Sequence, residues 1–122
     1  MSARSRVVVS VALVLVTVLI LGTVASAATF RVRARFANGD YRWRPKTLEV
    51  PTGSRVVWRI IDGRHTVTSY SDNWSKSTGT LRAGDRTSHT FDDGGTYRYR
   101  CTIHSTLNAG TCNGMCGRVV VG

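Results

Sequence analysis

The chain has 122 residues, which is enough for one domain and leaves little room for a second independent core. Its 17 Lys and Arg residues exceed its 7 Asp and Glu residues, so the net charge is +10 and anionic partners are favoured. No repeat or low-complexity tract interrupts the sequence.

The N-terminal segment has the pattern of an export signal. Arg4 and Arg6 precede an uncharged apolar run over residues 7–21, and the small residues Ala25-Ser26-Ala27 follow it. This pattern predicts a signal peptide over residues 1–27 and a mature domain over residues 28–122. An uncleaved anchor is the alternative, because the apolar stretch approaches the ~20 residues that span a bilayer. Either outcome predicts an exported domain that is periplasmic, at the cell surface or secreted.

The predicted mature domain remains strongly basic. Without Arg4 and Arg6, its 15 basic residues still exceed its 7 acidic residues by 8. Because an exported protein rarely meets nucleic acid, we expect no nucleic-acid partner. The expected partners are an acidic protein, an anionic membrane or a cell-wall polymer.

Alternating apolar and polar residues predict an all-β domain. In chain order, the strand patterns cover residues 29–36, 48–50, 56–60, 65–70, 86–91, 96–101 and 118–121. The turns at residues 37–40, 51–53 and 92–95 are rich in Gly, Asn and Asp, and residues 71–84 have the composition of a loop. We expect the strands at 48–50 and 56–60 to be adjacent, no helix after residue 28, and a β-sandwich with the interleaved arginines on its outer face.

All three cysteines lie in the last quarter of the chain, at positions 101, 112 and 116. An odd number of cysteines in an oxidising compartment suggests one disulfide, with the third thiol committed to another task such as metal binding. Tyr97, Tyr99 and Cys101 share one face of the predicted strand, while Arg98 and Arg100 share the other. We therefore expect the thiol of Cys101 to point inward at the end of a strand.

Four side chains form a candidate metal site. Cys101 and His104 are three residues apart, Met115 follows them, and His65 comes from a distant part of the chain. Two histidines, one cysteine thiolate and a weak axial methionine are the donors of blue copper sites. His89 lies within a predicted strand without a partner motif, so it is expected to be an ordinary sheet histidine.

Several sequence blocks resemble the cupredoxins, in particular plastocyanins, pseudoazurins and amicyanins. The Cys101-x-x-His104 spacing with the segment 114–119, Gly-Met-Cys-Gly-Arg-Val, is similar to their ligand loop. Three further blocks are similar to the family segments that lead into the two halves of that site. They are Trp43-x-Pro45-x-x-Leu48-x-Val50-x-x-Gly53-x-x-Val56-x-Trp58, His65-Thr66-Val67 and Gly95-Thr96-Tyr97-x-Tyr99-x-Cys101. The resemblance implies an antiparallel Greek-key sandwich. It also implies one copper ion held by His65, Cys101, His104 and Met115, and a one-electron carrier whose electrons leave near His104.

The ligand loop is longer than is usual in this family. Ten residues separate His104 from Met115, and Cys112 is among them. We expect a disulfide between Cys112 and Cys116 that closes the extra residues into a small ring and returns Met115 to the metal.

Two other functions remain open. Cys101, His104, Cys112 and Cys116 could instead form a structural zinc module, since zinc accepts one histidine and three thiolates. Alternatively, the protein could be an extracytoplasmic copper carrier or storage protein. Because no acid-base or nucleophile cluster is present in the sequence, we do not expect an enzyme. We also expect a monomer.

Overall fold

The structure is a computed structural model and describes residues 12, 14–17 and 28–122. The predicted signal peptide, residues 1–27, therefore lies almost wholly outside the described residues, and its cleavage stays a prediction. Among the described residues, no helix is long and apolar enough to cross a membrane.

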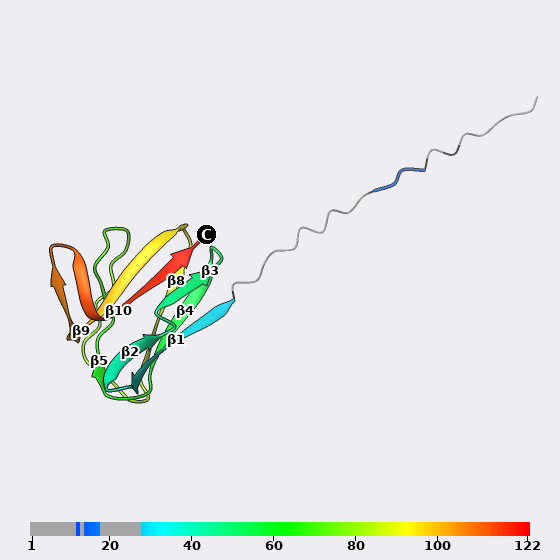
Figure 1. Cartoon of the computed structure of the whole chain (residues 1–122). Helices are drawn as coiled ribbons and strands as arrows, with labels where there is room; N and C mark the ends of the chain where they lie inside the picture. Colours follow the sequence, from blue (N-terminus) through cyan, green and yellow to red (C-terminus); the bar gives the residue numbers. More distant parts are fainter. Residues whose placement is uncertain (1–11, 13, 18–27) are drawn as a thin grey trace, which may run out of the picture.

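The domain contains strands and no helix over residues 28–122, as the alternating sequence pattern predicts (Figure 1). The strands are β1 (Thr29–Ala37), β2 (Asp40–Arg44), β3 (Thr47–Val50), β4 (Ser54–Ile60), β5 (Arg64–His65), β6 (Thr68–Ser69), β7 (Leu81–Arg82), β8 (Arg86–Phe91), β9 (Gly95–Asn108) and β10 (Thr111–Val121). The expected strand at 65–70 is two short strands, and the expected loop at 71–84 holds the short strand β7.

Two four-stranded sheets face each other. The first has the order β2-β1-β4-β8 and the second the order β3-β10-β9-β6, while β5 and β7 form a small separate pair. The β-sandwich prediction is confirmed. Most neighbouring strands are antiparallel, but β1 pairs with β4 and β3 pairs with β10 in parallel. Such parallel pairs arise because the chain passes repeatedly from one sheet to the other.

The expected pairing of the strands around the turn at residues 51–53 is wrong. The chain crosses between sheets at this turn, so β3 lies beside β10 whereas β4 lies between β1 and β8. Alternation predicted both strands correctly, but alternation describes which face is buried and not which strand is the neighbour. The crossing makes β4 the most buried strand of its sheet, with five of its seven residues buried.

The core fills the space between the two sheets with aromatic and β-branched side chains. Its largest fully buried members include Trp58, Tyr99 and Phe91, and Tyr97 is also buried. The arginines of β1 alternate with buried Val32 and Ala34 and are exposed, as expected for the outer face. Among the residues that the structure describes, the buried core cluster runs from Val32 to Val121, so residues 28–122 contain a core of their own.

The last two strands form a long hairpin that projects beyond the sandwich, drawn from yellow through orange to red in Figure 1. The sequence predicts a loop after Cys101, but β9 continues to Asn108, and the chain then turns at Ala109 and Gly110, both with positive φ. The register shifts within the hairpin: Ser105 pairs with Gly114, whereas Arg100 pairs with Cys116. Four residues of β9, positions 101–104, therefore bulge opposite the single residue 115 of β10.

Candidate metal centre

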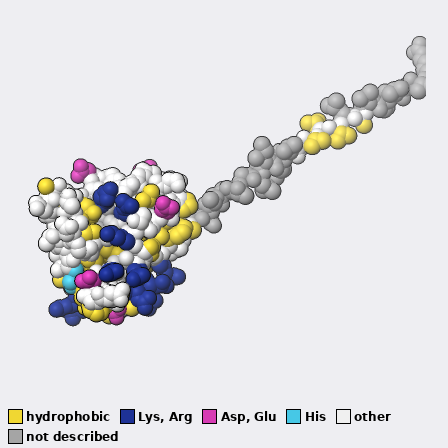
Figure 2. Space-filling view, viewed as in Figure 1, with side chains coloured by type: hydrophobic (Ala, Val, Ile, Leu, Met, Phe, Trp, Pro, Cys, Tyr) yellow, Lys and Arg dark blue, Asp and Glu magenta, His cyan; other side chains and the backbone are white. Residues whose placement is uncertain are grey.

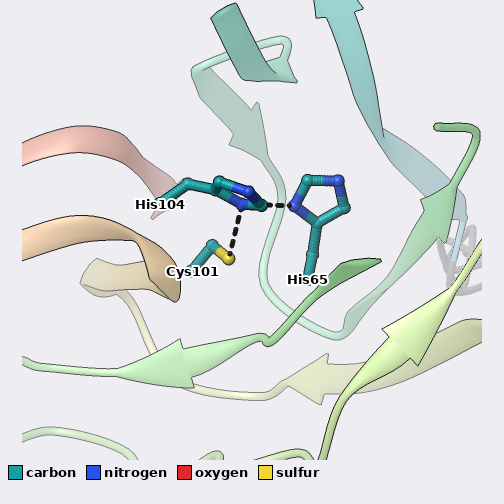
Figure 3. Close-up of side chains that lie close together, drawn as sticks. All are labelled: His65, Cys101 and His104. Atoms are coloured by element: carbon teal, nitrogen blue, oxygen red, sulfur yellow. Dashed lines mark hydrogen bonds between the residues drawn. The ribbon is translucent and has the colours of Figure 1, made fainter. Parts of the chain in front are cut away.

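Three of the predicted ligands meet at one end of the sandwich. His65 lies on β5, and Cys101 and His104 lie on β9. One donor atom from each of the three lies within 4.8 Å of the others. The Nδ1 atoms of the two histidines are 3.2 Å apart, and the Sγ of Cys101 is 3.5 Å from Nδ1 of His104. Figure 3 shows the two rings and the thiol converging on one point.

The neighbours of His65 fix which of its nitrogens can bind a metal. Its Nε2 lies 2.6 Å from the backbone carbonyl oxygen of Asp62, which can only accept a hydrogen bond. Nε2 therefore carries the proton, and the lone pair of Nδ1 is left facing Cys101 and His104. The side chain is fully buried. Burial lowers the pKa of His65, and the hydrogen bond to Asp62 and the charge of Asp62 only partly oppose this effect, so burial favours the neutral ring that metal ligation requires.

The thiol of Cys101 is fully buried and is the one free cysteine of the chain. Its sulfur accepts a hydrogen bond from the backbone N–H of Thr66 at 3.4 Å. Thr66 also ties the two ligand segments together, because its Oγ1 accepts the backbone N–H of Thr102 at 2.9 Å. The residue after His65 is thus clamped to the residue after Cys101. Hydrogen bonds around a thiolate of this kind influence the redox potential of a bound metal.

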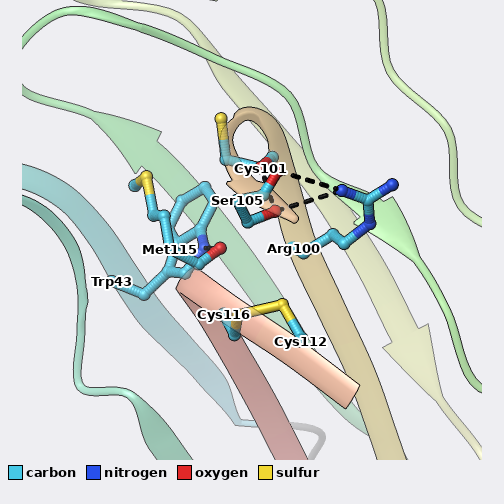
Figure 4. Close-up of a disulfide and its surroundings, with 7 residues drawn as sticks. All are labelled: Trp43, Arg100, Cys101, Ser105, Cys112, Met115 and Cys116. Carbon is cyan, nitrogen blue, oxygen red and sulfur yellow. Dashed lines mark hydrogen bonds between the residues drawn. A yellow bond between two sulfur atoms is a disulfide. The ribbon is translucent and has the colours of Figure 1, made fainter. Parts of the chain in front are cut away.

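His104 is half-buried and forms the open side of the group. Its ring packs against the ring of Tyr41, with centroids 4.5 Å apart. The bulge that carries it is braced by Ser105, whose hydroxyl donates to the carbonyl of Cys101 and accepts from Nη1 of Arg100 at 3.1 Å (Figure 4). These bonds hold the short path from Cys101 to His104 in one conformation.

Met115 is buried beside this group, at 2% exposure, directly opposite the bulge. The indole nitrogen of Trp43 donates to its carbonyl at 3.3 Å. Met115 and His104 line the same surface hollow, and in Figure 4 the sulfurs of Met115 and Cys101 point away from the disulfide. Gly114 precedes Met115 with φ +103°, and a side chain there would collide with the backbone carbonyl of His104. Glycine therefore allows β10 to approach the ligand segment closely.

The predicted disulfide between Cys112 and Cys116 is confirmed, with an S–S distance of 1.99 Å and a Cα–Cα distance of 6.2 Å. Both cysteines lie on β10, where four residues of extended strand would span about 13 Å. The strand is therefore bent between them, at Gly114 and Met115. The four-residue zinc module is not formed in this structure, because two of its thiols are bonded to each other.

Sequence reasoning missed the residues that support the ligands. Tyr41 is not among the residues expected at the site from the sequence, yet its ring contacts both His65 and His104. Asp62 lies in a turn, and Thr66 is a single polar residue directly after His65. The amino-acid composition around them therefore gives no indication of their roles. The alternation of the segment 40–44 could have identified β2, and with it the inward position of Trp43, which is buried at 3% exposure.

Comparison with solved structures places the fold. No protein-family model and no curated protein matches the chain. A purple cupredoxin from Nitrosopumilus maritimus is 24% identical with a TM-score of 0.58, over 75% of this chain and 98% of that one. A reduced mutant form of amicyanin is 25% identical with a TM-score of 0.60, over 82% of this chain and 87% of that one.

A copper-containing nitrite reductase from Thermus scotoductus is also similar, at 25% identity with a TM-score of 0.60 over 77% of this chain. The match covers only 22% of the length of that enzyme. These likenesses show that the all-β sandwich has the cupredoxin fold.

Proposed function

We propose that the protein is a blue, type 1 copper protein that carries single electrons outside the cytoplasm. The observation that carries this proposal is the donor set: two imidazole nitrogens and one buried thiol within 4.8 Å of one another. The thiolate suits Cu(I) and the imidazoles suit both oxidation states, so the residues fit one copper ion per chain. Bound copper would supply the one-electron chemistry.

Within this proposal, His65, Cys101 and His104 would hold the metal through Nδ1, Sγ and Nδ1. Met115 would supply a weak thioether donor, which its burial opposite the ligand bulge supports. Three strong donors and one weak donor would leave no position for a substrate, so the proposed function is that of a carrier rather than an enzyme.

The role of the surrounding residues is to keep the donors in place while the charge of the metal changes. His65 is held by the carbonyl of Asp62, Cys101 by the amide of Thr66, and the bulge by Ser105. A site held in this way needs little rearrangement between oxidation states, which favours fast electron transfer. Half-buried His104 is the proposed point of electron exit, since it is the ligand nearest to the solvent.

Export and an acidic redox partner are parts of the same proposal. The disulfide supports an oxidising compartment, in agreement with the N-terminal sequence pattern. The basic charge of the domain would steer an acidic partner protein, so the association rate should fall as salt rises. An association rate independent of salt would contradict this part.

Titration of the domain with Cu(II), followed by visible absorption, tests the copper proposal. We expect an intense blue band that saturates at one copper per chain in the wild type and is absent in Cys101→Ser. A protein that stays colourless and instead retains stoichiometric zinc would overturn the proposal.

A second measurement distinguishes electron transfer from copper delivery. The buried, braced donors favour slow release, so a weak Cu(I) chelator should remove little metal during reversible redox cycling. Rapid loss of Cu(I) to that chelator would instead support a carrier that passes its copper on.

A further inference from the structure

The outer face of the sheet β2-β1-β4-β8 carries a dense array of arginines. All members of the array are exposed and project from the side of the sheet opposite the core. We call this surface the arginine face, and its residues are Arg31, Arg33, Arg35, Arg42, Arg44, Arg55, Arg59 and Arg86. Figure 2 shows dark blue side chains gathered over the region where β1 and β2 run in Figure 1.

The strand register places these arginines directly opposite one another. Arg33 on β1 pairs with Arg44 on β2 and with Arg59 on β4. Arg59 in turn pairs with Arg86 on β8, so one row of arginines crosses all four strands of the sheet. Paired residues of neighbouring strands project on the same face, so the row forms a continuous line of positive charge.

The array extends in two directions. Neighbouring strands are about 4.8 Å apart, so the row of four spans roughly 14 Å across the sheet. Along β1, Arg31, Arg33 and Arg35 follow at every second residue and span roughly 13 Å. A plane of positive charge results, rather than a single line or a pocket.

Little within the protein compensates these charges. Among the described residues only one ion pair forms, between Arg42 and Asp40 at 3.8 Å, and both side chains are exposed. Arg55 donates to the hydroxyl of Ser88 at 3.1 Å, which is a neutral partner. Like charges directly opposite one another destabilise a sheet, so the isolated protein keeps this row at a cost in stability. An external anion would remove that cost.

We propose that the arginine face binds the surface of an anionic lipid membrane. An array that extends in two directions matches a surface of phosphate headgroups better than it matches one linear polymer. The sequence adds a second argument, because the apolar segment 7–21 precedes β1 and brings the domain to a membrane during export. The proposal is independent of the metal and adds a membrane contact to the proposed electron carrier.

The opposite sheet provides a matched control. There Arg98 on β9 pairs with Arg118 on β10, so two arginines again lie directly opposite each other on an exposed face. That group is smaller, because Arg118 also pairs with uncharged Thr47 on β3, and the next arginine on this face of β9, Arg100, donates to Ser105. Replacing Arg98 and Arg118 changes the net charge by the same amount as replacing Arg33 and Arg59.

The test measures binding of residues 28–122 to vesicles, because this segment contains a core of its own and lacks the apolar segment. Vesicles of phosphatidylglycerol and phosphatidylcholine are sedimented with the wild type, with Arg33→Gln/Arg59→Gln and with Arg98→Gln/Arg118→Gln. We expect the first double variant to weaken binding about 30-fold, the effect of two cationic side chains near an anionic membrane. The second should weaken it several-fold less.

A second readout separates binding from folding. Since Arg33→Gln/Arg59→Gln relieves repulsion, its thermal midpoint in the absence of vesicles should equal or exceed that of the wild type. Equal losses of binding in both double variants would overturn the proposal, because net charge alone would then explain them. Absence of binding to anionic vesicles, or binding only to soluble linear polyphosphate, would overturn it as well.

Discussion

The indole nitrogen of Trp43 donates a hydrogen bond of 3.3 Å to the backbone carbonyl of Met115, linking β2 to the strand that carries the proposed axial ligand. This bond crosses between the two sheets, since β2 and β10 belong to different ones. It holds the bent part of β10, at the position where a single residue faces the ligand bulge. The bond therefore joins the stability of the sandwich to the geometry of the site.

Replacing Trp43 with phenylalanine should affect both properties. The carbonyl of Met115 would lose its buried donor, which costs about 1–3 kcal/mol of unfolding free energy. A looser Met115 should also shift the visible bands of the copper-loaded protein. Trp74→Phe is the matched control, because the Trp74 indole also donates to a carbonyl, that of Arg98 at 3.1 Å, away from the ligands. An equal spectral shift in both variants would contradict the proposed link.

Replacing Thr66 with valine should weaken the clamp between the two ligand segments. Valine keeps the shape but leaves the backbone N–H of Thr102 without its acceptor, at a cost of about 1–3 kcal/mol. Urea unfolding of the copper-free protein measures this loss, and Thr66→Ser should restore most of it. In the copper-loaded protein the reduction potential should change in Thr66→Val and return towards the wild-type value in Thr66→Ser. An unchanged stability in Thr66→Val would show that the clamp is unimportant.

Removing the disulfide should lower the stability of the domain and change the part of the site near Met115. The bridge closes a loop of only a few residues, so Cys112→Ser/Cys116→Ser should lose on the order of 2 kcal/mol. We expect this variant still to bind one copper, because His65, Cys101 and His104 are braced by other bonds. Its absorption spectrum should differ from that of the wild type, since the bend at Met115 is no longer fixed. Complete loss of copper binding would show that the bridge supports all of the donors.

Stability should fall in mild acid partly because of His89. Burial, aided by the charge of Lys76 and opposed by Asp92, lowers the pKa of His89 in the folded protein. Above pH ~6.5 the imidazole is neutral in both states and this residue has no effect. As pH falls below that value, the unfolded chain takes up a proton more readily, so the folded state loses stability until its own lower pKa is passed.

The measurement compares urea unfolding of the wild type and His89→Gln at pH 7 and pH 5. The wild type should lose more stability between these pH values than the variant does. Comparison in the same metal state removes the contribution of His65, which both proteins share. An equal loss in both would exclude His89 as a source of the acid sensitivity.

The sequence predicted the parts of the fold that depend on alternation. Residues 86–91 form a strand over the expected range, and the alternation of Tyr97, Tyr99 and Cys101 correctly placed the thiol inside. Pairing between strands could not be predicted in the same way. The turn at Gly53 joins two strands of different sheets, and a turn between two apolar strands has the same composition whether or not those strands pair.

The metal-binding side chains of the site could be predicted from the sequence, but the residues that hold them in place could not. Cysteine and histidine at short spacing have a chemical meaning that a single sequence reveals, and the structure brings His65, Cys101 and His104 together. The hairpin beyond His104 was missed because Thr, Asn and Gly dominate it and give no apolar alternation. Contacts such as that of Tyr41 with His104 join distant segments, so only the folded chain reveals them.

The four-against-one bulge separates the tip of the hairpin from the ligands. Residues 105–114 pair with one another beyond the bulge, and Arg100 with Cys116 closes the ladder on the other side. A change in the length of the tip would therefore alter only the part of the hairpin beyond the Ser105–Gly114 pair and would leave the donor atoms in place. The tip is accordingly a natural insertion point, where a recognition peptide or an attachment to an electrode could be added at a constant distance from the site.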